Sequence, residues 1–168
     1  NTAVGTNALK FNTTLNNTAV GYNAGTSVTT GSSNTFIGTT TGQATTVGNT
    51  NTAIGGAALY TNVGGDRNVA IGYHSLYFFN PNGNNIDTYN TAIGHTALQH
   101  CSTGHSNTAI GGQALNSNQS ASNNTAVGYN SLSANTTGYD NVAFGSQTLD
   151  ANTTGYANTA LGRTALLK

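Results

Sequence analysis

The chain has 168 residues, of which 36% are hydrophobic and only 5% are charged, against roughly 25% charged residues in ordinary soluble domains. Four basic side chains balance four acidic ones, so the chain lacks the positive surface that binds nucleic acid or anionic lipid. No apolar run approaches the roughly 18 residues of a membrane span. We therefore expect neither a nucleic-acid partner nor membrane insertion.

An internal repeat, Asn-Thr-Ala-Val/Ile-Gly, runs from the first residue to the last, at intervals of 16, 17, 17, 17, 22, 17, 17, 17 and 17 residues. Such a period decides the architecture, because each repeat forms one structural unit that stacks on its neighbours. We expect a single repeat domain, 1–168, and number the positions of each coil from its first Asn. The ten coils begin at Asn1, Asn17, Asn34, Asn51, Asn68, Asn90, Asn107, Asn124, Asn141 and Asn158.

The columns of the repeat favour strands. Position 4 is always Val, Ile, Leu or Phe, position 9 is Leu in eight coils, and helical-hairpin repeats need roughly 33 residues. We predict an all-β, parallel β-solenoid (β-roll) with two short strands and two turns in each coil. Glycine at position 5 supplies the positive φ of a sharp corner. The corner glycines are Gly5, Gly21, Gly38, Gly55, Gly72, Gly94, Gly111, Gly128, Gly145 and Gly162.

Positions 3 and 4 are both apolar, although neighbouring strand residues face opposite sides. We expect position 4 to point into the coil and the small Ala of position 3 to pack against another copy in a homo-oligomer. The alternative, Ala simply tolerated on an exposed face, stays open. The predicted interface consists of Ala3, Ala19, Ala53, Ala70, Ala92, Ala109, Ala126, Ala143 and Ala160.

The 22-residue interval places an insertion within 77–89, which also contains the only proline. Insertions in solenoids map to one face, often the binding face. Either this loop contacts a sugar or protein, or its aromatic residues cover the neighbouring coil. The candidate binding residues are Tyr77, Phe78, Phe79, Asn82, Asn84 and Asp87.

Three histidines, His95, His100 and His105, lie five residues apart in one coil, and His74 lies in the coil before. A threefold assembly would bring copies of one histidine together, but positions 6, 11 and 16 lie on different sides of a coil, so we expect surface histidines and no metal or other cofactor. Cys101, the only cysteine, stands where other coils have Asn at position 12, and we interpret it as a substituted turn residue.

Catalytic motifs are absent from the sequence. It contains no Glu, its four Asp are scattered over separate coils, and no G-x-S-x-G, Walker loop or H-E-x-x-H occurs. We therefore expect no catalytic residues and no enzyme.

The segments Asn-Thr-Ala-Val-Gly-Tyr-Asn-Ser-Leu (124–132) and Asn-Thr-Ala-Ile-Gly-His-Thr-Ala-Leu (90–98) resemble repeats of phage-type tail fibres and bacterial surface proteins. More distantly, the whole chain is similar to the head repeats of YadA-type trimeric autotransporter adhesins. This resemblance implies a left-handed trimer of β-rolls acting as a fibre shaft or adhesive head. The family repeat carries no catalytic residues, and it is shorter than 17 residues, which puts the trimer packing in doubt.

These patterns predict a structural or adhesive fibre segment at a virion or cell surface, extracellular, which projects or contributes to binding of a glycan or protein receptor. We interpret the chain as a piece of a longer fibre, because neither end has a polar cap. A self-assembling extracellular filament is the alternative. An ice- or sugar-binding solenoid is a further one, since position 2 is Thr in eight coils. Ice binding needs that ladder exposed, whereas we expect position 2 to face inward with position 4.

Overall fold

The computed structural model describes residues 1–81, 83–84 and 86–167. The regular secondary structure of these residues consists of strands alone. The strands are β1 (Thr2–Val4), β2 (Thr18–Val20), β3 (Thr35–Ile37), β4 (Thr52–Ile54), β5 (Gly65–Asp66), β6 (Val69–Ile71), β7 (Ile86–Asp87), β8 (Thr91–Ile93), β9 (Thr108–Ile110), β10 (Thr125–Val127), β11 (Val142–Phe144) and β12 (Thr159–Leu161).

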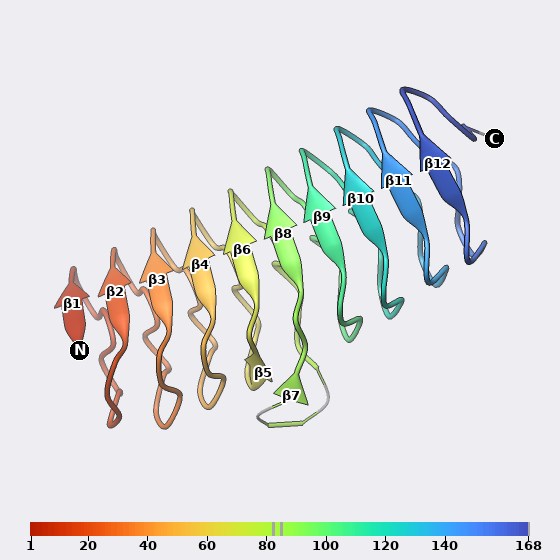
Figure 1. The fold of residues 1–168 in the computed structure, drawn as a ribbon. Coiled ribbons are helices and arrows are strands. Elements are labelled where there is room, and N and C mark those ends of the chain that lie inside the picture. The colour runs from red at the N-terminus through yellow and green to blue at the C-terminus, as the bar shows by residue number, and fades with distance from the viewer. Residues whose placement is uncertain (82, 85, 168) are drawn as a thin grey trace.

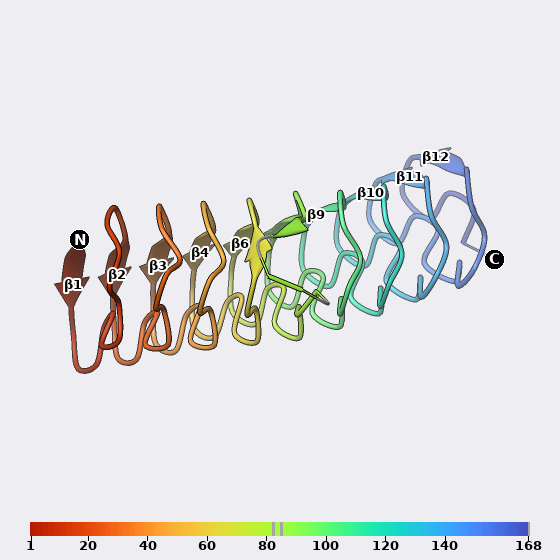
Figure 2. The same ribbon diagram turned by 90° about the horizontal axis from the view of Figure 1, so that it is seen from below.

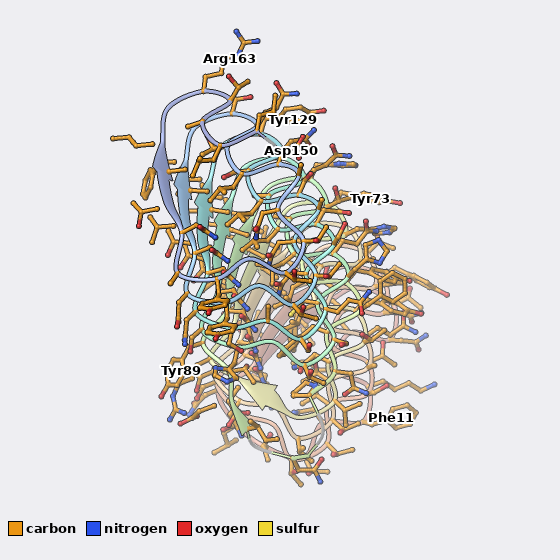
Figure 3. All side chains as sticks on the ribbon, turned by 90° about the vertical axis from the view of Figure 1, so that its right-hand side faces the viewer. Phe11, Tyr73, Tyr89, Tyr129, Asp150 and Arg163 are labelled. Atoms are coloured by element: carbon orange, nitrogen blue, oxygen red, sulfur yellow. The ribbon has the colours of Figure 1, made fainter. Side chains whose placement is uncertain are left out.

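The ten three-residue strands form one parallel sheet in the order β1-β2-β3-β4-β6-β8-β9-β10-β11-β12, with each strand paired to that of the next coil (Figure 1). Equivalent repeat positions are partners, as in Thr18 with Thr35 and Val20 with Ile37. The strands ascend on one side and the chain returns behind them as the stack advances, which makes the coil left-handed (Figures 1 and 3). The predicted all-β parallel solenoid is confirmed.

Each coil contains one strand of the main sheet, not two. The prediction of a second strand around positions 8 and 9 is wrong, because position 9 is left-handed throughout, as shown by Leu59 and Leu98 with φ of 53° and 51°. Extended chain cannot contain such a residue. Positions 7 and 17 are left-handed as well, for instance Asn130 at 54° and Asn123 at 62°. The return path is therefore a series of bends, which Figure 2 shows from below.

The interior of the stack is formed by positions 1, 3, 8, 9 and 12. Position 3 points inward and position 4 outward, so our assignment of the two faces was inverted. In seven coils the position 3 Ala is fully buried, while Ala160 is 5% exposed and Ala3, in the first coil, is exposed. The predicted Ala interface is thus wrong for the buried residues, which cannot contact another chain. They are Ala19, Ala53, Ala70, Ala92, Ala109, Ala126, Ala143 and Ala160.

Alanine is required inside because the coil is too narrow there for a larger side chain beside the position 9 Leu. The exception demonstrates this limit: Phe36 occupies position 3 of its coil and is fully buried, while Gly25 and Gly42 occupy position 9 there and in the coil before. A Cβ at Gly42 would lie 2.3 Å from Phe36 Cε1. The volume that Phe36 adds at position 3 is offset by the volume that the glycines leave free at position 9.

The insertion leaves the stack after Asn80 and rejoins it by Thr88. The backbone N–H of Asn80 still donates to Ser102 O (2.9 Å), and that of Ser106 donates to Thr88 O (2.7 Å), so the coil on either side keeps its register. Strands β5 and β7 pair at the end of the coils opposite the arrowheads of the main sheet (Figure 1). The extra residues therefore leave the pairing of the neighbouring coils intact.

Candidate functional site

The outward face of the main sheet carries two columns. Position 2 is threonine in eight coils and valine in two (Val69 and Val142), and position 4 is Val, Ile, Leu or Phe. The apolar column is exposed in six coils, with Val20 36%, Ile37 38% and Phe144 43% exposed. It is half-buried in the other four, at Ile54, Ile71, Ile93 and Val127. The threonines between the terminal coils, such as Thr52 and Thr91, are half-buried in their own ladder. We call these two columns the strand face.

The strand face is narrow, regular and uncharged. Parallel strands repeat about every 4.8 Å, so the columns extend over about 43 Å from β1 to β12. None of the ten strands contains a charged residue. Figure 3 looks along the stack and shows this face on the left, with Tyr73 and Tyr129 on the opposite side of the coil. Soluble proteins rarely expose so long an apolar column unless it binds something.

A ladder of buried asparagines fixes the start of each strand. At position 1 of the coil that begins at Asn124, the side-chain Oδ1 accepts from the backbone N–H of Asn141 (3.0 Å) and from its Nδ2 (3.1 Å). The Asn124 Nδ2 donates to Gly138 O at 2.8 Å within its own coil. Both ends of the buried amide are satisfied, which holds successive strands in register and keeps the strand face straight.

Position 5 ends the strand face with a sharp corner, as predicted. All ten corner glycines have φ between 116° and 137°, a region that favours glycine. Space excludes a side chain as well, because a Cβ at Gly111 would lie 2.5 Å from Gly128 O in the next coil. The corner glycines are therefore confirmed as structural residues.

The candidate loop residues separate into three groups. Phe78 is 46% exposed and Tyr77 half-buried, whereas Phe79 is fully buried at position 12, so Phe79 is wrong as a binding residue and belongs to the core. Asp87 forms an ion pair with Arg67. Tyr77 and Phe78 stand at positions 10 and 11 of the coil, before the insertion leaves the stack. Of the other predicted residues, Asn84 is exposed and Asn82 lies outside the described residues.

Aromatic and imidazole rings gather beside this loop, in columns that sequence analysis did not connect. Tyr60 stacks on Tyr77 with centroids 5.0 Å apart, and Phe78 stacks on His100 of the next coil at 5.3 Å. Next to them lies an open groove of about 510 Å³, lined by Phe78, His100, Ser102, Ser117 and Gln119. Aligning positions 11 and 13 of successive coils identifies these residues.

The histidines do not converge on a metal site. In the described residues no group of three His, Cys or Asp side chains is placed to hold an ion. His74 stacks on Tyr73 at 3.8 Å and packs against Tyr77 at 4.5 Å. Burial, and to a lesser extent the charge of His95, lower the pKa of His74. The imidazoles thus act here as flat packing groups.

Cys101 lies inside the coil at position 12, in line with buried asparagines of other coils, as expected for a substituted turn residue. Its Sγ lies 3.5 Å from Gly104 O and 3.9 Å from Asn118 Nδ2. Burial raises the pKa of this thiol to about 12. A protonated, inaccessible thiol is unsuited to nucleophilic chemistry.

Comparison with known proteins finds no matching family model, no similar curated protein and no similar solved structure. Among the described residues there is no helix that is long and apolar enough to cross a membrane. The function must therefore be argued from the strand face and the groove.

Proposed function

We propose that this chain is a structural and adhesive fibre segment in which parallel copies associate through their strand faces. The observation that carries the proposal is the uncharged strand face, where an apolar column points outward in every coil. Full burial of one such aliphatic side chain contributes about 1.5–3 kcal/mol. Nine aliphatic side chains and Phe144 on one side provide a strong reason for the faces to meet.

Three copies around a common axis are the arrangement we propose, since the repeat resembles trimeric adhesin heads. Each stack would turn its strand face to the axis and its loop outward. The fibre would stand outside the cell, on a virion or cell surface, where the outward side reaches a glycan or protein receptor. The Ala columns have no part in this interface because they fill the coils.

The test is the mass of the purified chain by light scattering, with Ile110→Asp as the disrupting variant. Ile110 is 37% exposed in the middle of the strand face, and a trimer would bring three of these carboxylates together without partners. We expect a discrete trimer for the wild type and monomers for the variant. Burying an unpaired charge is strongly unfavourable.

Tyr129→Asp is the matched control. Tyr129 is 56% exposed and projects on the side opposite the strands (Figure 3), so the trimer should persist. Open-ended filaments of the wild type in negative-stain images would instead support the filament alternative, and a wild-type monomer would contradict the interface.

Ice binding is a second candidate, because the threonine column shares the outward strand face rather than pointing inward as we expected. The flat, repeating spacing of threonine and aliphatic side chains supports this alternative. The two functions need the same surface, so the same sample separates them. A monomer whose thermal hysteresis disappears in Ile110→Asp would favour ice, and a trimer without thermal hysteresis would exclude it.

A further inference from the structure

The groove beside the loop forms where a stack of rings ends. Position 11 is Phe78, His100 and Ser117 in three successive coils. The first two rings stack with centroids 5.3 Å apart and planes 18° apart. Ser117 offers no ring to continue the stack, so the groove opens next to the imidazole. Neighbouring position 13 supplies Ser102 and Gln119 as the other wall.

The polar groups of the groove keep free donors and acceptors. Ser102 Oγ donates to the backbone oxygen of Gln119 at 3.0 Å, which leaves its lone pairs to accept. Within the described residues, no hydrogen bond engages the Ser117 hydroxyl, the Gln119 side-chain amide or the His100 imidazole. Donors and acceptors therefore line the groove alongside two ring surfaces.

Charge is missing from this surface. None of the five lining residues is Asp, Glu, Lys or Arg. An anionic ligand such as a phosphate or a sialylated sugar would find no Lys or Arg, and a cationic peptide no carboxylate. The ligand that fits is neutral and rich in hydroxyl groups, with an apolar ring face.

Size points the same way. The groove spans three coils, about 10 Å along the stack at 4.8 Å for each step. Its volume of about 510 Å³ lies in the range of small-molecule sites. A stable protein interface needs about 800 Å² on each partner, which a groove lined by five side chains does not provide.

We propose that this groove binds a neutral saccharide, with a sugar ring packed on His100 and Phe78 and its hydroxyls bonded to Ser117, Ser102 and Gln119. The inference rests on the proposed adhesive function and names its ligand class. It also explains why the rings gather in these coils, next to the insertion, rather than along the whole stack.

The experiment is binding of the full chain to an array of immobilised neutral, sialylated and sulfated glycans, repeated with Ser117→Phe. This substitution extends the ring stack over His100 and fills the groove without removing any core group. We expect binding to at least one neutral glycan, and a decrease in affinity of about tenfold or more in the variant.

Ala151→Phe is the matched control, because Ala151 is exposed at the same position 11 two coils further on. It should bind like the wild type. Binding to no neutral glycan, binding only to acidic glycans, or equal binding by wild type and Ser117→Phe would each overturn the proposal. Circular dichroism of all samples confirms that each variant is folded.

Light scattering on the same samples separates this inference from the proposed function. A monomer with Ser117-dependent glycan binding would contradict the proposed fibre interface and support the saccharide site. A trimer without glycan binding would remove the saccharide site and keep the fibre.

Discussion

At the scale of single residues, Phe36 shows how closely the inside of one coil is filled. It replaces an alanine, and the two coils that surround its ring have glycine where eight others have leucine. The would-be Cβ of Gly25 lies 2.8 Å from Phe36 Cδ2, and that of Gly42 lies even closer. Residues so close in space are expected to be coupled energetically.

The coupling can be measured with Gly42→Leu, Phe36→Ala and the double variant. Gly42→Leu restores the usual residue but collides with Phe36, so we expect destabilisation by about 1–3 kcal/mol. Phe36→Ala leaves a cavity and is expected to lose about 3–5 kcal/mol. The double variant rebuilds the common coil and should lose clearly less than the sum in urea unfolding. Additive effects would contradict the packing described for this coil.

At the scale of the element, the position 1 asparagines fix the register of neighbouring strands, which apolar packing alone does not specify. Eight of them, from Asn17 to Asn141, are at most 1% exposed. Each links its own coil to the next through its side-chain oxygen, as Asn107 does to Asn124 N at 3.0 Å. A shift in register by one residue would leave this whole row without partners.

Asn124→Ala tests the ladder. The change leaves the buried Asn141 N–H without its partner, whereas Gly138 O keeps the side-chain amide of Asn135 at 2.8 Å. A buried polar group left unpaired costs about 1–3 kcal/mol. We expect a loss of about 1–3 kcal/mol in the free energy of unfolding, measured by urea denaturation. Asn84→Ala, in the exposed part of the loop, should change it by less than about 0.5 kcal/mol. Equal effects at the two sites would mean that the ladder does not stabilise the fold.

How much of this was predictable differs from element to element. The period and the invariant columns led to the solenoid, its parallel sheet and its glycine corners, because every coil repeats the same local requirement. Which of positions 3 and 4 faces the interior was not predictable from alternation alone, since either set of alternating residues could point inward. The signal that decides between them was present: Phe36 together with Gly25 and Gly42 indicates that position 3 shares the interior with position 9.

The groove was missed for a different reason. Tyr77 and Phe78, which precede the insertion, were predicted to bind because of their rings. The residues that line the groove with Phe78, among them His100, Ser117 and Gln119, come from the next two coils. Each looks unremarkable in its own coil. Only reading the columns side by side, with the insertion removed, brings them together.

At the scale of the whole molecule, coils are interchangeable units. The coil from 124 to 140 touches its neighbours through the same pairings that they would make with each other, such as Thr108 with Thr125 and Thr125 with Val142. Solenoid stability is close to a sum of such nearest-neighbour terms.

Deleting residues 124–140 should therefore leave a folded stack one coil shorter. We expect β-rich circular dichroism to persist and the maximum dimension in small-angle X-ray scattering to fall by about 4.8 Å. Deleting 124–131 instead leaves residues 132–140 as nine extra residues before Asn141, which we expect to project from the stack as the insertion within 77–89 does. Unfolding by the full-coil deletion would show that these coils are not equivalent.

The direction of the hydrogen bonds has a mechanical consequence. Strands lie across the long axis, and bonds such as Gly128 N to Ile110 O (2.8 Å) run along it from coil to coil. Tension applied to the two ends is transmitted through these junctions in series, so every junction bears the full load. A longer stack is therefore no harder to pull apart than a short one, and resistance to tension increases only when copies bind side by side.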